Sequence, residues 1–170
     1  MFDFDERDRP PTGRPQMWVE RLKANATYQC TILSEAPYAL IVHYANKRSS
    51  PHLKDKEHCP GCVRKEGMRW KLYLHVLNHH KRQEEFLELP TIAGETFLSF
   101  FPKGTMIRGQ RIQLTKGNGD KTRVNISILP PLCSPGSSSL PQPKDPKKTL
   151  IELWGLLPEQ RRFGDERDVA

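Results

Sequence analysis

The chain has 170 residues, 15 of them proline, and only 36% are hydrophobic, so we expect one domain with some tail and a limited core. Its longest apolar runs, such as that from Tyr38 to Tyr44, are far too short to cross a membrane. The acidic, proline-rich N-terminus lacks the apolar segment of a signal peptide. We therefore expect a cytoplasmic protein, whose paired cysteines bind metal rather than form disulfides.

The net charge of +7 favours a polyanionic partner. Lys47 to Arg82 contains ten Lys and Arg against three acids, and Pro102 to Arg123 contains six against one. Basic segments between acidic ends are typical of a nucleic-acid-binding protein, although charge alone is equally consistent with a solvated surface.

The elements of the N-terminal half are two strands and a long loop. Residues 1–16 have the composition of a disordered arm, and residues 17–24 fit a short helix or a lead-in strand. Polar and apolar residues alternate over 27–33, which predicts a strand, and 36–44 predicts a second strand buried on both faces. No periodicity follows from Ala45 to Gly67, and a loop of that length inside a compact domain requires something to order it.

Alternation resumes over 69–78, with Trp70 on the apolar face and Tyr73 on the polar face. Residues 84–101 begin as a strand and then fit a short helix with Thr91 as its N-cap. Further along, two strands flank a connection rich in Gly and Asn, which indicates a β-hairpin. These strands run from Gln110 to Thr115 and from Thr122 to Leu129.

The C-terminal region differs in composition. Residues 130–148 form a linker rich in Pro and Ser, and residues 149–170 hold a short docking helix and a tail. The helical spacing of its apolar residues predicts the helix. We expect these residues to bind a partner: Leu150, Leu153, Trp154 and Leu157. Five or six strands with one intervening helix predict a mainly-β fold, a small barrel of the oligonucleotide-binding (OB) type over residues 17–129.

A Cys-x2-Cys knuckle, Cys59 and Cys62, lies in the long loop and supplies two of the four ligands of a tetrahedral zinc site. His43 and His52 complete the best set, with the spacing His-x8-His-x6-Cys-x2-Cys. His58 ranks lower because it adjoins Cys59. A structural zinc ion at these positions orders the loop over 43–67.

Other chemistry of a Cys-x2-Cys pair fits less well. A thioredoxin-like redox pair requires a βαβ pattern, which this sequence lacks. Catalytic zinc requires an open coordination position and a general base; Glu57 and Glu66 are nearby, but neither stands in the His-x-Glu arrangement of the deaminases.

Single-strand binders combine a cationic groove with aromatic rings on which bases stack. Tyr44 and Tyr73 are the predicted stacking platforms, whereas Trp70 is more consistent with core. The candidate nucleic-acid-binding residues are Tyr44, Lys47, Arg48, Arg64, Lys65, Arg69, Lys71, Tyr73, Arg108, Arg111, Lys116, Lys121 and Arg123.

The order of His, a further ligand and Cys-x2-Cys, inserted in a basic barrel, resembles the zinc-containing single-stranded DNA-binding (helix-destabilising) proteins of T-even phages and related mobile elements. The hairpin at 107–129 is also similar to the closing hairpin of that family. The resemblance implies an OB barrel, structural zinc held by His43, His52, Cys59 and Cys62, and a role in replication, recombination or mobile-element maintenance. His52 stands where the family usually has a cysteine.

Three functions are therefore open. The leading hypothesis is a non-catalytic, sequence-tolerant single-stranded DNA-binding protein, with RNA as a possible strand. The second is a zinc-dependent adaptor that docks a replication or transposition protein through its C-terminal helix. The third, a metal-dependent nuclease built on Asn78, His79, His80 and Glu84, is disfavoured because adjacent histidines on a strand point to opposite faces.

Overall fold

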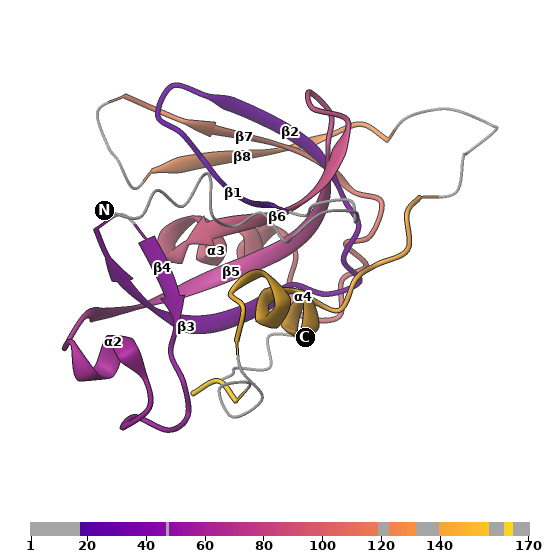
Figure 1. Ribbon diagram of the computed structural model, residues 1–170. Helices are drawn as coiled ribbons and strands as arrows, with labels where there is room; N and C mark the ends of the chain where they lie inside the picture. Colours follow the sequence, from indigo (N-terminus) through magenta and orange to yellow (C-terminus); the bar gives the residue numbers. More distant parts are fainter. Residues whose placement is uncertain (1–17, 47, 119–122, 132–139, 157–161, 165–170) are drawn as a thin grey trace.

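A computed structural model describes residues 18–46, 48–118, 123–131, 140–156 and 162–164 (Figure 1). The predicted arm at 1–16, Lys47, Lys121 and Leu157 lie outside the described residues, as do residues 132–139 of the linker. The strands are β1 (Trp18–Arg21), β2 (Thr27–Ile32), β3 (Tyr38–Ala45), β4 (Arg48–Pro51), β5 (Gly67–Asn78), β6 (Gln83–Pro90), β7 (Arg111–Lys116) and β8 (Val124–Leu129). The helices are α2 (Pro60–Val63), α3 (Thr91–Phe100) and α4 (Pro146–Leu153).

The long strand β5 organises the sheet. Strand β6 pairs along one edge of β5, while β3 and β2 share the other edge in succession. Ile32 pairs with Val76 but Tyr38 pairs with Tyr73, so five residues (33–37) on one side lie opposite two (74 and 75) on the other and the edge is interrupted between β2 and β3.

Beyond β2 the order continues through β7 to β8, and β1 runs parallel to β6 at the other end. All other pairs are antiparallel. The mainly-β prediction is confirmed. Within the described residues, no ladder joins β8 to β1 or β6, so the sheet is not closed into a barrel.

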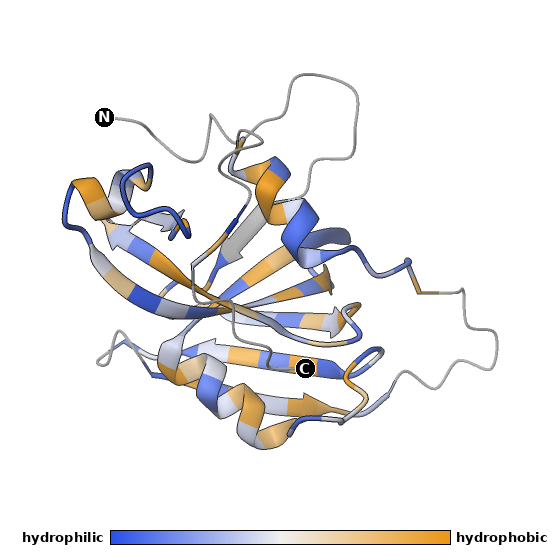
Figure 2. Ribbon diagram, turned by 90° about the horizontal axis from the view of Figure 1, so that it is seen from below, coloured by the Kyte–Doolittle hydropathy of each residue, from blue (hydrophilic) through white to orange (hydrophobic). Residues whose placement is uncertain are grey.

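The main core lies between the β2–β7–β8 layer and the β3–β5–β6 layer, with α3 against it (Figure 1). Leu72, Leu74 and Val76 of β5 point into this core and meet Phe97 of α3 and Ile112 of β7. Apolar and polar residues alternate along the strands (Figure 2), because successive side chains of a strand face opposite sides.

A second apolar cluster covers the opposite face of β3, β5 and β6. Leu40, Tyr73 and Phe86 from these strands pack with Leu150 of α4 and with Phe163. Helix α4 therefore docks on the chain's own sheet (Figure 1). The apolar face that we predicted to bind a partner is used here instead: Leu150 is fully buried, and Leu153 and Trp154 are half-buried.

Several predicted boundaries need correction. Of the two alternatives for residues 17–24, the strand is the one observed, as β1; the loop predicted over Ala45–Gly67, by contrast, contains β4 and α2. Thr91 is not the N-cap of α3, which is Pro90; its hydroxyl donates instead to the carbonyl of Trp70. Helix α4 begins within the predicted linker, because Asp145 caps it by accepting from the amide of Lys148, with Pro146 in the first turn.

Candidate metal centre

Four side chains converge at the end of the sheet next to α2. His43 comes from β3, His52 follows β4, Cys59 precedes α2 and Cys62 lies within it. One potential ligand atom from each lies within 4.8 Å of all the others. His43, His52 and Cys59 are buried and Cys62 is half-buried. The set predicted from the Cys-x2-Cys spacing is brought together by the fold.

The distances between these atoms approach those of a tetrahedral metal site. His43 Nε2 lies 3.0 Å from His52 Nδ1, 3.3 Å from Cys59 Sγ and 3.5 Å from Cys62 Sγ. His52 Nδ1 lies 3.9 Å from Cys59 Sγ and 3.5 Å from Cys62 Sγ. Zinc bonds of about 2.05 Å to nitrogen and about 2.3 Å to sulfur place two nitrogens about 3.3 Å apart, and nitrogen and sulfur about 3.6 Å apart. The cluster is thus compatible with zinc.

Backbone groups outside the cluster hold two of the four ligands. The Nδ1 atom of His43 lies 3.1 Å from the carbonyl oxygen of Glu66, and donating to it leaves the Nε2 lone pair directed at the cluster. The amide of Leu53 lies 3.4 Å from Cys59 Sγ and donates to it. Such a hydrogen bond stabilises the thiolate form that binds metal.

Close packing around the histidine rings requires glycine at two positions. A Cβ atom on Gly61, inside the knuckle, would lie 2.2 Å from Cγ of His43. A Cβ atom on Gly164 would lie 2.7 Å from Cδ2 of His52. The glycine of the Cys-Pro-Gly-Cys turn therefore has a packing role: it lets the His43 ring lie against α2.

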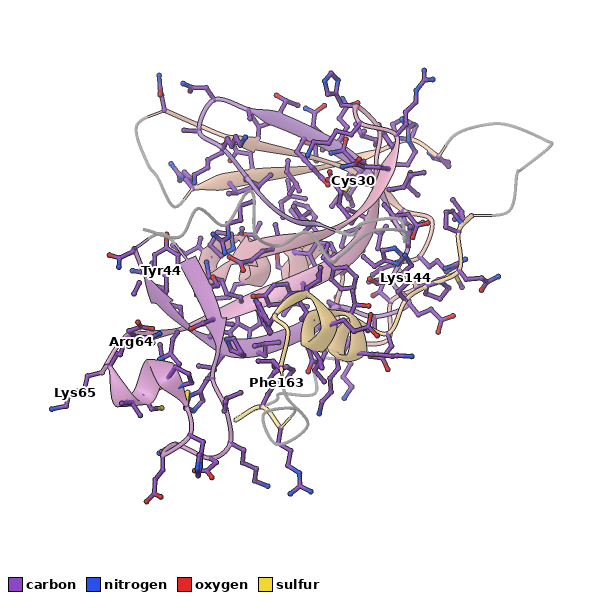
Figure 3. The ribbon with its side chains drawn as sticks, viewed as in Figure 1. Cys30, Tyr44, Arg64, Lys65, Lys144 and Phe163 are labelled. Atoms are coloured by element: carbon purple, nitrogen blue, oxygen red, sulfur yellow. The ribbon has the colours of Figure 1, made fainter. Side chains whose placement is uncertain are left out.

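Within the cluster, burial, reinforced by the neighbouring Cys59, raises the pKa of the Cys62 thiol. Cys30 and His58 lie outside the cluster. Cys30 lies in β2, away from α2 (Figure 3), and burial raises its pKa far above the ordinary value. His58 is exposed, and its hydrogen bond to Asp55 lowers the pKa of that carboxyl. His58 is therefore not part of the cluster.

One predicted stacking residue, Tyr44, lies on the surface beside two cations. It is half-buried, with the Arg69 guanidinium 4.8 Å and the Lys71 ammonium 5.1 Å from its ring centroid. Arg64 and Lys65 are exposed and project from the α2 end of the molecule (Figure 3). Arg64 also pairs with Glu66 at 2.6 Å.

The other predicted stacking residue is wrong for this fold. Tyr73 is fully buried, its hydroxyl donates to Glu88 at 2.8 Å, and its ring packs edge-on to Trp154 at 6.1 Å. Burial, together with Glu88, raises its pKa well above the ordinary value. Lys71 is also buried and pairs with Glu88 at 3.4 Å, and burial lowers its pKa. No base can stack on Tyr73, because α4 covers that face.

Three predicted phosphate contacts are used within the chain. Arg108 donates to the carbonyls of Leu33, Leu140 and Pro141, and so fastens the segment before α4. Arg111 donates to Pro130 and Lys116 to Leu22. Arg123 is exposed, and the side chain of Arg48 is outside the description.

The residues of the disfavoured nuclease do not gather. Asn78 donates to Glu85, His79 bonds Thr31, and Glu84 bonds His75. Within the described parts of the chain, the cluster of His43, His52, Cys59 and Cys62 is the one group of three or more metal-binding side chains.

Sequence reasoning missed the basic side chains that surround His52, namely Lys54, Lys56, Lys147 and Arg162. Lys54 and Lys56 were visible in the basic loop, but nothing in the sequence places Lys147 and Arg162 beside them. It also missed the buried carboxylate of Glu88, which contacts Ser49, Tyr73, Lys71 and Arg21.

Neither the known family models, nor the curated proteins, nor the solved structures contain a match to this chain. Among the described residues, no helix is both long and apolar enough to span a membrane. The functional assignment therefore depends on the geometry of the chain itself.

Proposed function

We propose that this chain is a non-catalytic single-stranded nucleic-acid-binding protein that carries a structural zinc ion. The observation that carries the proposal is the half-buried Tyr44 beside the exposed Arg69 guanidinium, on the strand that also supplies the candidate ligand His43. An aromatic ring next to an exposed cation offers a stacking surface and a phosphate contact together.

The zinc ion has a structural role in this proposal. Four protein ligands leave no position for a substrate or water, which is the arrangement of structural rather than catalytic zinc. Binding the ion links β3, the residue after β4, and α2, so it fixes the basic residues Arg64 and Lys65 relative to Tyr44.

The order of the elements supports an OB-type relationship. Strands β2 and β3 together share one edge of β5, β6 follows, α3 lies between β6 and β7, and β7 pairs with both β2 and β8. This order agrees with that expected of a five-stranded OB barrel, apart from the closing pair. In this view, the resemblance to phage helix-destabilising proteins covers about Thr27 to Leu129, including the loop that holds the candidate ligands and the hairpin of β7 and β8.

A fluorescence-anisotropy titration tests the function. Labelled single-stranded and duplex oligonucleotides are compared at two salt concentrations, on protein of measured zinc content. We expect about one zinc per chain, a preference for single strands, and an affinity that falls steeply with salt because phosphate contacts release counterions. Equal affinity for both forms, or no response to salt, would contradict the proposal.

Two variants test whether Tyr44 lies in the nucleic-acid-binding surface. Replacing Tyr44 by Ala removes the stacking ring, which costs about 1–3 kcal/mol of binding free energy. Phe100→Ala is the matched control, because Phe100 is an aromatic residue of α3 that is 47% exposed and lies outside this surface. If both variants bind as the wild type does, Tyr44 is not a stacking platform.

A further inference from the structure

A hollow of about 520 Å³ lies on the side of the metal centre that faces the C-terminal segment. We call it the basic hollow. It is lined by His52, Phe163 and Gly164, and by four cationic side chains. These cations are Lys54 and Lys56 of the metal loop, Lys147 of α4 and Arg162 of the C-terminal segment.

The two walls of the basic hollow are fixed to each other by backbone contacts. The amide of Lys54 donates to the carbonyl of Arg162 at 2.8 Å, and the amide of Gly164 donates to that of His52 at 2.8 Å. Leu53 and Phe163 form the β-bridge between these bonds. Phe163 is 4% exposed and lies between α4 and the metal loop (Figure 3).

The described lining of the hollow carries charge of one sign. Within the described residues, its lining contains no carboxylate, and the Lys147 ammonium lies 5.7 Å from the centroid of the Phe163 ring. Four cations held around one concave surface repel each other, and an anion that enters the hollow relieves this repulsion. Three separate segments supply these cations, so the positive potential arises only in the folded, joined structure.

We propose that the basic hollow is a phosphate-binding site. The phosphate is either part of a polynucleotide backbone or belongs to a free nucleotide; both share the same chemistry, and the volume accommodates a nucleotide-sized group. The polynucleotide source rests on the proposed function, whereas the binding of phosphate itself does not. Because His52 belongs to both sites, the metal centre positions one wall of the hollow.

The test uses the full zinc-loaded chain and isothermal titration with thymidine 3′,5′-bisphosphate, with thymidine as the ligand that lacks phosphate. The variant Lys54→Ala/Arg162→Ala removes one cation from each wall. Its matched control, Lys23→Ala/Lys103→Ala, removes two exposed cations that lie outside the hollow. Zinc content and tryptophan fluorescence verify that each variant is folded.

We expect the wild type and the control to bind the bisphosphate but not thymidine, and the hollow variant to bind it at least about tenfold more weakly. No binding by the wild type, or equal binding by the hollow variant, overturns the proposal. Displacement of a labelled single strand by the bisphosphate assigns the site to the polynucleotide, and binding of both without displacement assigns it to a free nucleotide.

The two proposals can fail separately. If the chain binds the bisphosphate but no oligonucleotide, the phosphate site stands and the proposed function does not. If single strands bind with the affinity of the wild type in the hollow variant, and the bisphosphate binds to neither protein, the proposed function stands and this inference is wrong.

Discussion

Replacing Gly61 by Ala tests the metal centre through one added methyl group. The new Cβ would lie 2.2 Å from Cγ and 2.3 Å from Cδ2 of the His43 ring. Ordinary contact begins near 3.4 Å, so the ring has to withdraw by about 1.2 Å, the difference between 3.4 and 2.2. Metal–ligand distances tolerate only about 0.2 Å. His43 therefore leaves the coordination sphere, and we expect zinc affinity to fall by at least about 100-fold.

Gly67→Ala is the matched control, because a Cβ atom on Gly67 meets nothing within 4 Å. Zinc affinity is measured by competition with a chromophoric chelator, and thermal unfolding is followed with and without zinc. We expect Gly61→Ala to lose most of the zinc-dependent increase in melting temperature and Gly67→Ala to retain it. Equal zinc affinity of the two variants would refute the packing argument and the role of His43 as a ligand.

Three further predictions concern the core, the tail helix and pH. Gly94→Ala should destabilise the protein by up to about 2 kcal/mol in urea unfolding: its Cβ would lie 2.5 Å from Cζ3 of Trp70, overpacking of this kind costs about 1–3 kcal/mol, and the gain in helix propensity offsets about 1 kcal/mol of it; a more stable variant would show that the ring moves freely. Leu150→Ala should cost about 2–5 kcal/mol in the same assay, since Leu150 is fully buried against the sheet, whereas an unchanged stability would mean that α4 is not docked in solution. Burial and Cys59 raise the pKa of Cys62, so the metal-free thiol holds a proton at neutral pH that zinc must displace; chelator competition should show zinc affinity rising by at least about tenfold per pH unit around pH 7, and a flat profile would contradict a thiolate ligand.

Docking of the C-terminal helix on the sheet weakens the adaptor hypothesis. That hypothesis required the apolar residues of the helix to be available to another protein. Leu150 is instead buried against Tyr73 and Phe86, and Arg108 fastens the segment before the helix. Removal of the residues after Leu129 would therefore expose the second apolar cluster, so a truncated chain does not separate nucleic-acid binding from partner binding.

Local patterns were sufficient for much of this structure. Alternation identified β2 and β5, because a strand with one face on a core repeats every two residues. An apolar run identified β3, and the Gly- and Asn-rich connection identified the hairpin of β7 and β8. The Cys-x2-Cys spacing led to the four residues of the cluster, because a tetrahedral site restricts which neighbouring residues can reach an ion. The choice of His43 and His52 depended on the return of the loop toward β3, which the pairing of β3 with β4 provides.

Burial of the outer face of β5 could not be predicted from the strand alone. Alternation placed Lys71 and Tyr73 on a polar face, yet a segment about seventy residues further along the chain covers that face. Lys147 of α4 and Arg162 of the C-terminal segment also line the basic hollow. The sequence of a strand predicts which residues share a face. The element that packs on that face is determined by contacts between distant segments. The four residues of the candidate metal centre could therefore be named from the sequence, but the surface around them only from the fold.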